Sequence, residues 1–299
     1  MESVLASAPA KINLALAVGE RRSDGYHPLH TVYQAVDLCD ELRAAPRDDT
    51  DITFAISSGA NEDIPLDERN LAVRAAVALR THAGIETGVS MTLRKVIPVG
   101  GGMAGGSTDA AAALVACDAL WELGTPRDQL MRLAAELGSD VPFCLVGGTA
   151  LGTGRGEQVS PVLARGTYHW VLGCSERGLS TAAVYAAHDR LGGRDGTPQV
   201  RPQLMSALVT ADPVELGAAL HNDLQAAALS LRPELQAGLD VGRECGALGA
   251  LVSGSGPTLM FLASGPEHAL DLATALAGAQ VCDDVVRATG PVAGAHLTT

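Results

Sequence analysis

The stretch Pro98-Val-Gly-Gly-Gly-Met-Ala-Gly-Gly-Ser-Thr-Asp109 decides the fold class, because five glycines fall within residues 100–106. Glycine inside a helix or strand costs roughly 0.5–1 kcal/mol relative to alanine, so this density predicts a loop whose backbone approaches another group closely. Apolar residues alternate before the loop at Val89, Met91 and Leu93, which predicts a strand, and the alanine-rich run after it predicts a helix. This order indicates a phosphate site, since the free N–H groups and dipole of a helix N-terminus favour an anion.

Three other interpretations of the glycine loop were weighed. A P-loop ends in Gly-Lys-Ser/Thr, whereas Gly106 is followed directly by Ser107, so a P-loop is excluded. The dinucleotide fingerprint GxGxxG begins at Gly100, but it needs a second strand after the helix, and Pro126 instead opens another helical pattern. A merely flexible loop is disfavoured by the strong helix pattern that follows.

Two further motifs agree with a third kind of phosphate site. Pro9-Ala-Lys-Ile-Asn-Leu14 lies near the start of the chain, and Val252-Ser-Gly-Ser-Gly-Pro-Thr258 lies near its end. Together with the loop at 98–109, they resemble the three motifs of the GHMP kinases, in the same order and over nearly the whole chain. Asp24-Gly-Tyr-His27 and Gly138-Ser-Asp-Val-Pro142 are most similar to the branch that phosphorylates a cytidylylated methylerythritol.

The resemblance implies an α/β (α+β) fold of two domains with the active site in the cleft between them. A ribosomal-protein-S5-like N-terminal domain with the ATP loop is expected over residues 1–157, and a ferredoxin-like C-terminal domain over residues 158–299. The implied reaction is phosphoryl transfer from ATP, with Mg²⁺, to a hydroxyl of a small molecule. Such catalysis depends mostly on positioning and charge stabilisation.

Lys11 and Asp140 are the catalytic residues that the resemblance implies. Lys11 directly precedes the apolar segment Ile12–Val18. Burying a lysine beside such a strand is costly unless the ammonium has a partner. The alternative is a lysine at a sheet edge that reaches solvent. Asp140 follows a helix-ending glycine and precedes an apolar run, so it is either a helix N-cap or a partly buried carboxylate close to Lys11. In the implied mechanism, Asp140 accepts the hydroxyl proton and Lys11 neutralises charge.

The ATP loop implied by the resemblance departs from the usual family pattern at two dipeptides. Met103-Ala104 replaces leucine-glycine, and Thr108-Asp109 replaces serine-asparagine. Because alanine does not adopt positive φ easily, the backbone geometry at Ala104 is left open. Ser107 is expected to contact phosphate or Mg²⁺, and no second protein ligand for the metal can be identified. The implied ATP-binding residues are Pro98, Val99, Gly100, Gly101, Gly102, Met103, Ala104, Gly105, Gly106, Ser107 and Thr108.

The acceptor site is expected at the other end of the cleft. Tyr26 lies in a polar turn where no core requires a ring, although a plain hairpin tip would have the same composition. Tyr185 begins a helix of the second domain, and it either packs between the domains or faces the cleft. If both rings face the cleft, they can stack on a cytosine base. The implied substrate-binding residues are Asn13, Tyr26, His27, Thr181 and Tyr185.

Composition narrows the class of protein. The 299 residues are 47% hydrophobic and 18% charged, as in a globular protein that can bury a core. The net charge of −13 argues against nucleic acid as a partner, although a local cationic pocket can still bind an anionic substrate. Of the 21 basic residues, only Lys11 and Lys95 are lysines; a role for Lys11 is expected, and that of Lys95 is left open.

Six scattered cysteines without a CxxC pair indicate a reducing compartment and no zinc site. No targeting or membrane-spanning segment is recognised, so a soluble cytoplasmic enzyme without a membrane or an obligate protein partner is expected. The alternatives are another small-molecule kinase of the family (homoserine or mevalonate type), a nucleotide-binding oxidoreductase and a catalytically inactive relative. The last is disfavoured by the presence of both Lys11 and Asp140.

Local patterns predict the main elements. Short strands are expected at Val4–Ala6, Ile12–Val18, Glu41–Ala45 and Ile52–Ile56, and helices at Asn70–Thr81 and from Pro126 to Gly138. In the second half, helices are expected at Leu204–Leu208, Pro213–Leu220, Pro233–Arg243 and Glu267–Leu276. Strands are expected at Gly249–Val252, Thr258–Leu262 and Asp283–Arg287.

Overall fold

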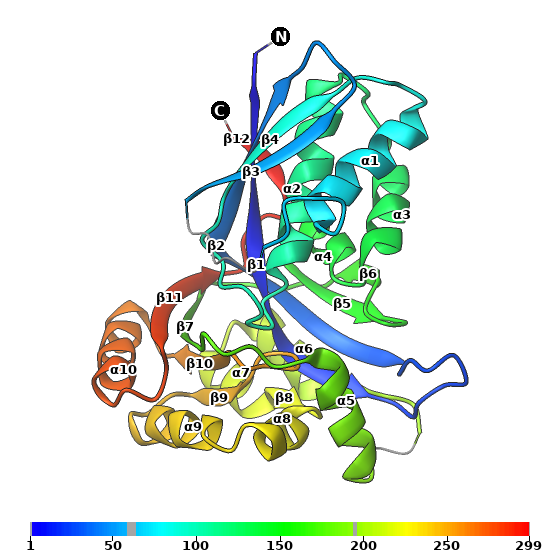
Figure 1. Cartoon of the computed structure of the whole chain (residues 1–299). Helices are drawn as coiled ribbons and strands as arrows, with labels where there is room; N and C mark the ends of the chain where they lie inside the picture. Colours follow the sequence, from blue (N-terminus) through cyan, green and yellow to red (C-terminus); the bar gives the residue numbers. More distant parts are fainter. Residues whose placement is uncertain (1, 59–63, 194–195, 299) are drawn as a thin grey trace.

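The computed structural model describes residues 2–58, 64–193 and 196–298, which form two sheets with helices packed against them (Figure 1). The first sheet has the order β12-β1-β2-β4-β3, with β5 on β2, β6 on β5 and β8 on β1. Its strands are β1 Val4–Val18, β2 Leu29–Pro46, β3 Ile52–Ser58, β4 Val89–Arg94, β5 Thr149–Thr153, β6 Gln158–Pro161, β8 His221–Asn222 and β12 His296–Thr298.

The second sheet is antiparallel, with the order β11-β7-β10-β9. Its strands are β7 Tyr168–Cys174, β9 Gly249–Val252, β10 Leu259–Ala263 and β11 Asp284–Gly290. The two helical groups lie in different parts of the molecule, with α1–α4 in the upper part of Figure 1 and α5–α10 in the lower part. The first group is α1 Leu71–Ala83, α2 Gly105–Leu120, α3 Arg127–Leu137 and α4 Val141–Val146. The second group is α5 Thr181–Arg190, α6 Pro202–Thr210, α7 Pro213–Ala219, α8 Gln225–Leu231, α9 Leu235–Glu244 and α10 Pro266–Gly278.

Helix α2 is the centre of the first core. It packs against α1, β1 and β2, and every residue from Thr108 to Leu114 is buried. A helix that is apolar on all sides is one that is enclosed on all sides, and the alanines at 110–113 let its neighbours approach closely. The sequence pattern therefore predicted this helix correctly, and its burial fixes the loop that precedes it.

The expectation of two short strands at the N-terminus is wrong. One strand, β1, runs through Ala8 and Pro9, with register shifts against β2 at Pro9/Ala10 and at Asn13/Ala15. The segment Glu41–Ala45 likewise belongs to the longer strand β2. Local patterning suggested breaks because the irregularities in pairing disturb the alternation, whereas the strand itself continues.

Helix α1 confirms the expected Asn70–Thr81 helix and shows how its ends are set. Asn70 is the N-cap, and its side chain accepts a hydrogen bond from the N–H of Ala72 at 2.8 Å. Gly84 ends the helix in the left-handed conformation, with φ of 65°. The apolar run at Val141–Val146 is a short helix, α4.

The two halves of the chain interleave. The first sheet takes β6, β8 and β12 from beyond residue 157, so the expected division between 157 and 158 falls within the β5–β6 hairpin. Strand β8 pairs with Ala15 and Leu16 of β1, and β12 pairs with residues 5–7 near the beginning of β1. The division into 1–157 and 158–299 thus remains a prediction about folding units. Among the described residues, no helix has the length and apolarity needed to cross a bilayer.

A buried ion cluster fixes both ends of the glycine loop. Lys95, which follows β4, donates to Asp40 of β2 at 2.5 Å and to Asp109 of α2 at 2.8 Å. The other oxygen of Asp40 accepts from the N–H groups of Val96 and Ile97 at 2.6 and 2.9 Å. All three charged side chains are at most 6% exposed. The role that the sequence left open for Lys95 is therefore structural.

The cluster contains two carboxyl groups and one ammonium. Burial, together with the neighbouring Asp40, raises the pKa of Asp109 to about 8 although Lys95 opposes the shift. Removing the ammonium would leave the buried carboxyl groups without a compensating charge, which is the more costly way to break such a cluster.

We expect Lys95→Met to lower the free energy of unfolding by about 3–5 kcal/mol, because it leaves buried carboxylates unpaired. Urea denaturation followed by circular dichroism measures the change. The matched control is Arg94→Met on the neighbouring residue, whose ion pair with Glu41 at 3.2 Å is exposed and should contribute about 0–1 kcal/mol. Equal losses in the two variants would contradict the structural role of the cluster.

Candidate active site

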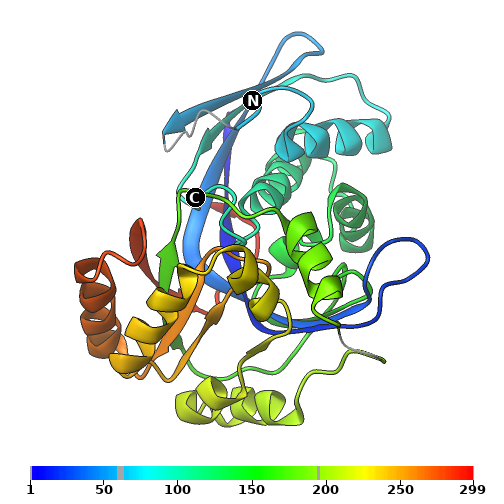
Figure 2. The same cartoon turned by 60° about the horizontal axis from the view of Figure 1, so that its bottom comes forward.

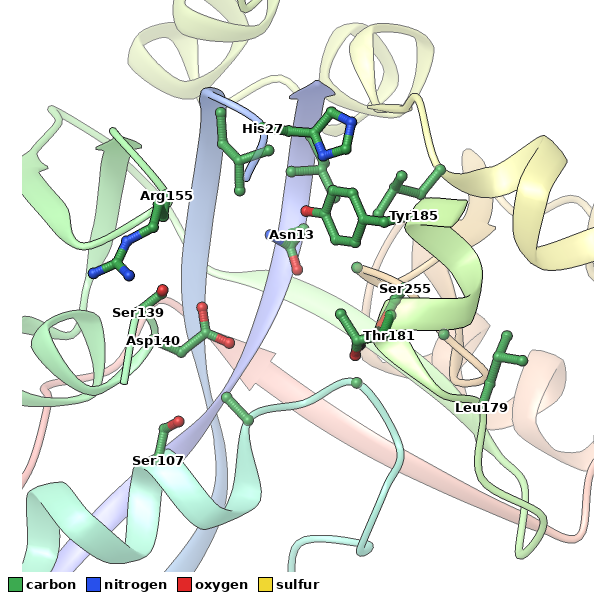
Figure 3. Close-up of a pocket in the computed structure, with 18 of the residues that line it drawn as sticks. Asn13, His27, Ser107, Ser139, Asp140, Arg155, Leu179, Thr181, Tyr185 and Ser255 are labelled. Carbon is green, nitrogen blue, oxygen red and sulfur yellow. Dashed lines mark hydrogen bonds between the residues drawn. The ribbon is translucent and has the colours of Figure 1, made fainter. Parts of the chain in front are cut away.

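A cavity of about 850 Å³ lies where the glycine loop, β1 and helix α5 meet. Figure 3 shows side chains from opposite walls that point into it: Asp140 and Ser107 on one side, Tyr185 and Thr181 on the other. The turn between β1 and β2 closes one end and projects beside α5 (Figures 1 and 2). The three sequence motifs therefore meet at one cavity.

Lys11 lies on the floor of the cavity, at the middle of β1. Its ammonium is 3.6 Å from Asp140 and donates to Asn13 at 2.8 Å, and it is only 5% exposed as a residue. The alternative of a lysine reaching solvent is therefore wrong. Asn13 in turn donates to Thr31 at 2.8 Å, and Thr31 donates to the carbonyl of Ala15 at 2.7 Å. This chain of bonds holds the ammonium in place.

Asp140 occupies the residue before α4, but its side chain makes no capping hydrogen bond. Instead, one carboxylate oxygen accepts from the hydroxyl of Tyr33 at 3.1 Å, and the other faces Lys11. Asp140 therefore stands at the N-cap position of α4 without capping the helix through its carboxylate, and the expected partly buried aspartate close to Lys11 is confirmed. Its side chain is 31% exposed, on the cavity side.

The glycine loop lies against the third motif. Gly102 has a φ of 77°, and a Cβ there would lie 2.9 Å from the carbonyl oxygens of Ser253 and Gly256. The N–H of Thr258 donates to the carbonyl of Gly101 at 3.3 Å. Only glycine permits this close backbone approach, so the loop is held from the second half of the chain as well as by Lys95.

The structure shows the backbone conformation at Ala104, which the sequence left open. Ala104 is the residue before α2 and adopts the left-handed conformation, with φ of 60° and ψ of 30°. For a residue with a Cβ, this conformation costs roughly 1–2 kcal/mol. The turn directs the chain into α2. Gly105, Gly106 and Ser107 line the cavity, and their N–H groups have no partner within the helix.

The expected ATP-binding residues fall into three groups. Gly100, Gly101, Gly102, Ala104, Gly105, Gly106 and Ser107 line the cavity. Met103 and Thr108 are buried; the carbonyl of Met103 accepts from the N–H of Lys11 at 3.2 Å, and Thr108 donates to the carbonyl of Pro9 at 3.0 Å. Pro98 and Val99 lead into the loop outside the lining.

The expected substrate-binding residues lie at the opposite end. The rings of His27 and Tyr185 stack with centroids 5.1 Å apart, and His27 contacts Asp189 at 2.8 Å. Tyr26 is 54% exposed, and the guanidinium of Arg155 lies over its ring, 5.2 Å from the ring centroid. All five of these residues line the cavity. The ring stacked on Tyr185 is therefore His27, and Tyr26 stands further out.

Thr181 and Asn13 complete this wall, since both line the cavity. The hydroxyls of Thr181 and Ser255 are 2.9 Å apart, which links α5 to the third motif. Sequence reasoning missed Thr31, Tyr33, Arg155 and Asp189. Of these, Asp189 had a local signal, because it lies four residues after Tyr185 and so on the same face of one helix. Ser255 lies within the third motif, although no separate role was expected for it.

The hydroxyl of Ser107 fits a magnesium ion that arrives on nucleotide phosphates. Ser107 lies in the first turn of α2 and lines the cavity (Figure 3). Mg²⁺ takes one or two protein oxygens plus phosphate and water more readily than a full protein cage. Within residues 2–58, 64–193 and 196–298, no cluster of three His, Cys, Asp or Glu side chains is placed to hold a metal.

Comparison with known families agrees with this geometry. The chain matches the GHMP kinases N terminal domain over residues 70–148 and the GHMP kinases C terminal domain over residues 204–281. The chain belongs to the GHMP kinases. The expected family and its two-domain α/β fold are thus confirmed.

Within the family, the chain is similar over its full length to 4-diphosphocytidyl-2-C-methyl-D-erythritol kinases. It is 56% identical to that of Thermobifida fusca, over 99% of this chain and 98% of the relative. It is 53% identical to that of Mycolicibacterium smegmatis, over 99% of this chain and 92% of the relative.

Two solved structures have similar TM-scores against this chain but differ in sequence identity and in the substrate that their names give. A 4-(cytidine 5'-diphospho)-2C-methyl-D-erythritol kinase matches with a TM-score of 0.75 and 34% identity, over 96% of this chain and 98% of the other. A homoserine kinase from Cytophaga hutchinsonii has a TM-score of 0.78 at 21% identity, over 100% and 98%. The second likeness shows the fold alone.

Proposed function

We propose that this protein transfers the γ-phosphate of ATP to the 2-hydroxyl of 4-diphosphocytidyl-2-C-methyl-D-erythritol, a step of non-mevalonate isoprenoid synthesis. The observation that carries the proposal is the full-length identity of 50–56% to kinases of that name. The reaction needs ATP and one small-molecule acceptor, and no protein or nucleic-acid partner. A cytoplasmic setting fits the six free cysteines.

ATP would bind with its phosphates against the glycine loop. The N–H groups at the start of α2 and the positive end of that helix face the cavity, where they favour an anion. A magnesium ion held by Ser107 and the phosphates would neutralise charge on the transferred group. The loop is held at both ends and against the third motif, so it needs little reorganisation on binding.

Asp140 would accept the proton of the acceptor hydroxyl while the hydroxyl oxygen bonds to the γ-phosphorus. The bond from that phosphorus to the β–γ bridging oxygen breaks, and ADP leaves with the electron pair. Lys11, 3.6 Å from Asp140, would stabilise the carboxylate and the negative charge that develops beside it. The remaining exposed face of Asp140 is directed into the cavity, where an acceptor can reach it.

The cytidine end of the acceptor would lie against the aromatic wall. Tyr185 offers a ring face that His27 already supports from one side, and Tyr26 lies at the outer edge. Base–aromatic stacking is sequence-tolerant but strong, and the polar atoms of His27, Thr181 and Asn13 are within the same cavity. The volume of this cavity, about 850 Å³, is at the upper end of the usual range for ligand pockets, roughly 300–1,000 Å³.

A coupled ADP-release assay with a panel of acceptors tests the proposed substrate. We expect turnover with 4-diphosphocytidyl-2-C-methyl-D-erythritol and little with free methylerythritol, homoserine or mevalonate, because only the first can use the aromatic wall. Efficient phosphorylation of homoserine or mevalonate would instead favour another member of the family. Efficient use of free methylerythritol would contradict a role for the cytidine end.

For the catalytic pair, we expect Asp140→Asn to keep ATP binding but to lower kcat by about 10²–10⁴-fold, the usual loss for a missing general base. Lys11→Met should cost a similar factor. The double variant should be little worse than either single one, because residues that act as a unit are not additive. Steady-state kinetics measures all three, and fully multiplicative losses would show that the two residues act independently.

For the acceptor site, we expect Tyr185→Ala to raise the KM for the acceptor by about 5- to 150-fold, since base stacking contributes roughly 1–3 kcal/mol. The KM for ATP should stay unchanged. Tyr185→Phe is the matched control, because it keeps the ring and should be nearly silent. The stacking role is wrong if Tyr185→Ala and Tyr26→Ala both leave the acceptor KM unchanged in folded protein.

A further inference from the structure

The hydroxyl of Tyr33 makes a contact that the catalytic roles above do not use. It donates to one oxygen of Asp140 at 3.1 Å, while the other oxygen of that carboxylate is 3.6 Å from the ammonium of Lys11. Tyr33 comes from β2, Lys11 from β1 and Asp140 from the residue before α4. The two oxygens of the carboxylate are thus held by two groups from different elements.

The ring of Tyr33 has almost no freedom to move. It is 2% exposed and lies 4.8 Å from the ring of Phe143, between centroids. A Cβ at Gly152 would come within 2.5 Å of a ring carbon of Tyr33, and one at Gly156 within 2.3 Å of its hydroxyl oxygen. Glycine at both positions leaves a slot that the ring and its hydroxyl fill. The direction of the hydrogen bond to Asp140 is therefore fixed by packing.

The surroundings keep Tyr33 a donor. Burial, and next the charge of Asp140, raise the pKa of Tyr33 well above its ordinary value, so the phenol stays protonated. The other titratable groups around the pair are Lys11, Cys144 and Tyr185. Burial raises the pKa of Cys144 to about 12 and raises that of Tyr185, so both stay neutral and Lys11 is the nearby charge.

We propose that Tyr33 is a positioning residue for Asp140, whose carboxylate it holds in one orientation beside Lys11. A hydroxyl gives a stronger hydrogen bond to a carboxylate than to a neutral carboxyl group. With one oxygen bound to Tyr33, the second is kept beside Lys11 and on the cavity side. The kinetic consequence rests on the proposed role of Asp140 as base, whereas the contact itself does not.

Tyr33→Phe tests the proposal, because it removes the hydroxyl and keeps the ring. We expect kcat at pH 7 to fall about 10-fold, from the loss of a hydrogen bond to a charged group, while the KM for ATP stays within about twofold. Removing a donor to the ionised form favours protonation, so the acidic limb of the kcat profile should move to higher pH.

Tyr168→Phe is the matched control. Tyr168 is also 2% exposed, and its hydroxyl has no hydrogen-bond partner within the described part of the chain. It lies on β7, outside the cavity lining, so its loss should leave kcat and the pH profile unchanged. Thermal unfolding of both variants checks that they remain folded at the assay temperature.

Titration of the Asp140 carboxyl carbon by NMR separates this proposal from the proposed function. The signal is assigned by its loss in Asp140→Asn, and its midpoint should move to higher pH in Tyr33→Phe but not in Tyr168→Phe. An unmoved midpoint overturns the positioning role, whatever the kinetics. A moved midpoint supports it, and if kcat is then unchanged, the role of Asp140 as base is what fails.

Discussion

The ammonium of Lys95 is the constraint on which the site depends. The glycines let the backbone of the loop approach other groups closely, but they also leave the loop without a preferred conformation. Lys95 ties the start of the loop to Asp40 on the sheet and its end to Asp109 on α2, all within 2.5–2.8 Å and out of solvent. The close contact of Gly102 with the third motif then fixes the middle. A flexible sequence becomes a rigid cradle because its neighbours hold it.

The two lysines of the chain have opposite surroundings. Lys95 is enclosed with two carboxyl groups, and the raised pKa of Asp109 shows how unfavourable a second buried negative charge is there. Lys11 faces one carboxylate, Asp140, that is open to the cavity. The first arrangement stabilises the fold, and the second leaves a charged group accessible to a ligand. The carboxyl groups around Lys95 are buried, whereas the carboxylate beside Lys11 is open to the cavity, and this difference separates the structural cluster from the catalytic pair.

The sequence predicts those features that rest on local chemistry. The glycine loop and the alanine-rich helix follow from residue types, whereas the approach of Lys11 to Asp140 was implied by the family resemblance; the structure contains all three. The continuous β1 could not be predicted, because its register shifts appear only against β2. Ala104 adopts a conformation against its own preference, since the packing on either side of it determines the turn. The contact of Tyr33 with Asp140 could not be predicted either, because it spans 107 residues.

The pairing of β1 with β12 has a consequence for how the protein is made. Leu5–Ser7 pairs with His296–Thr298, so this edge of the first sheet is completed only after residues 296–298 have left the ribosome. N-terminal domains generally fold first during synthesis, but here β1 has an open edge until β12 arrives. Open edges pair readily with other chains. The edge of β1 is therefore open to aggregation while residues 8–295, between the two paired segments, are made.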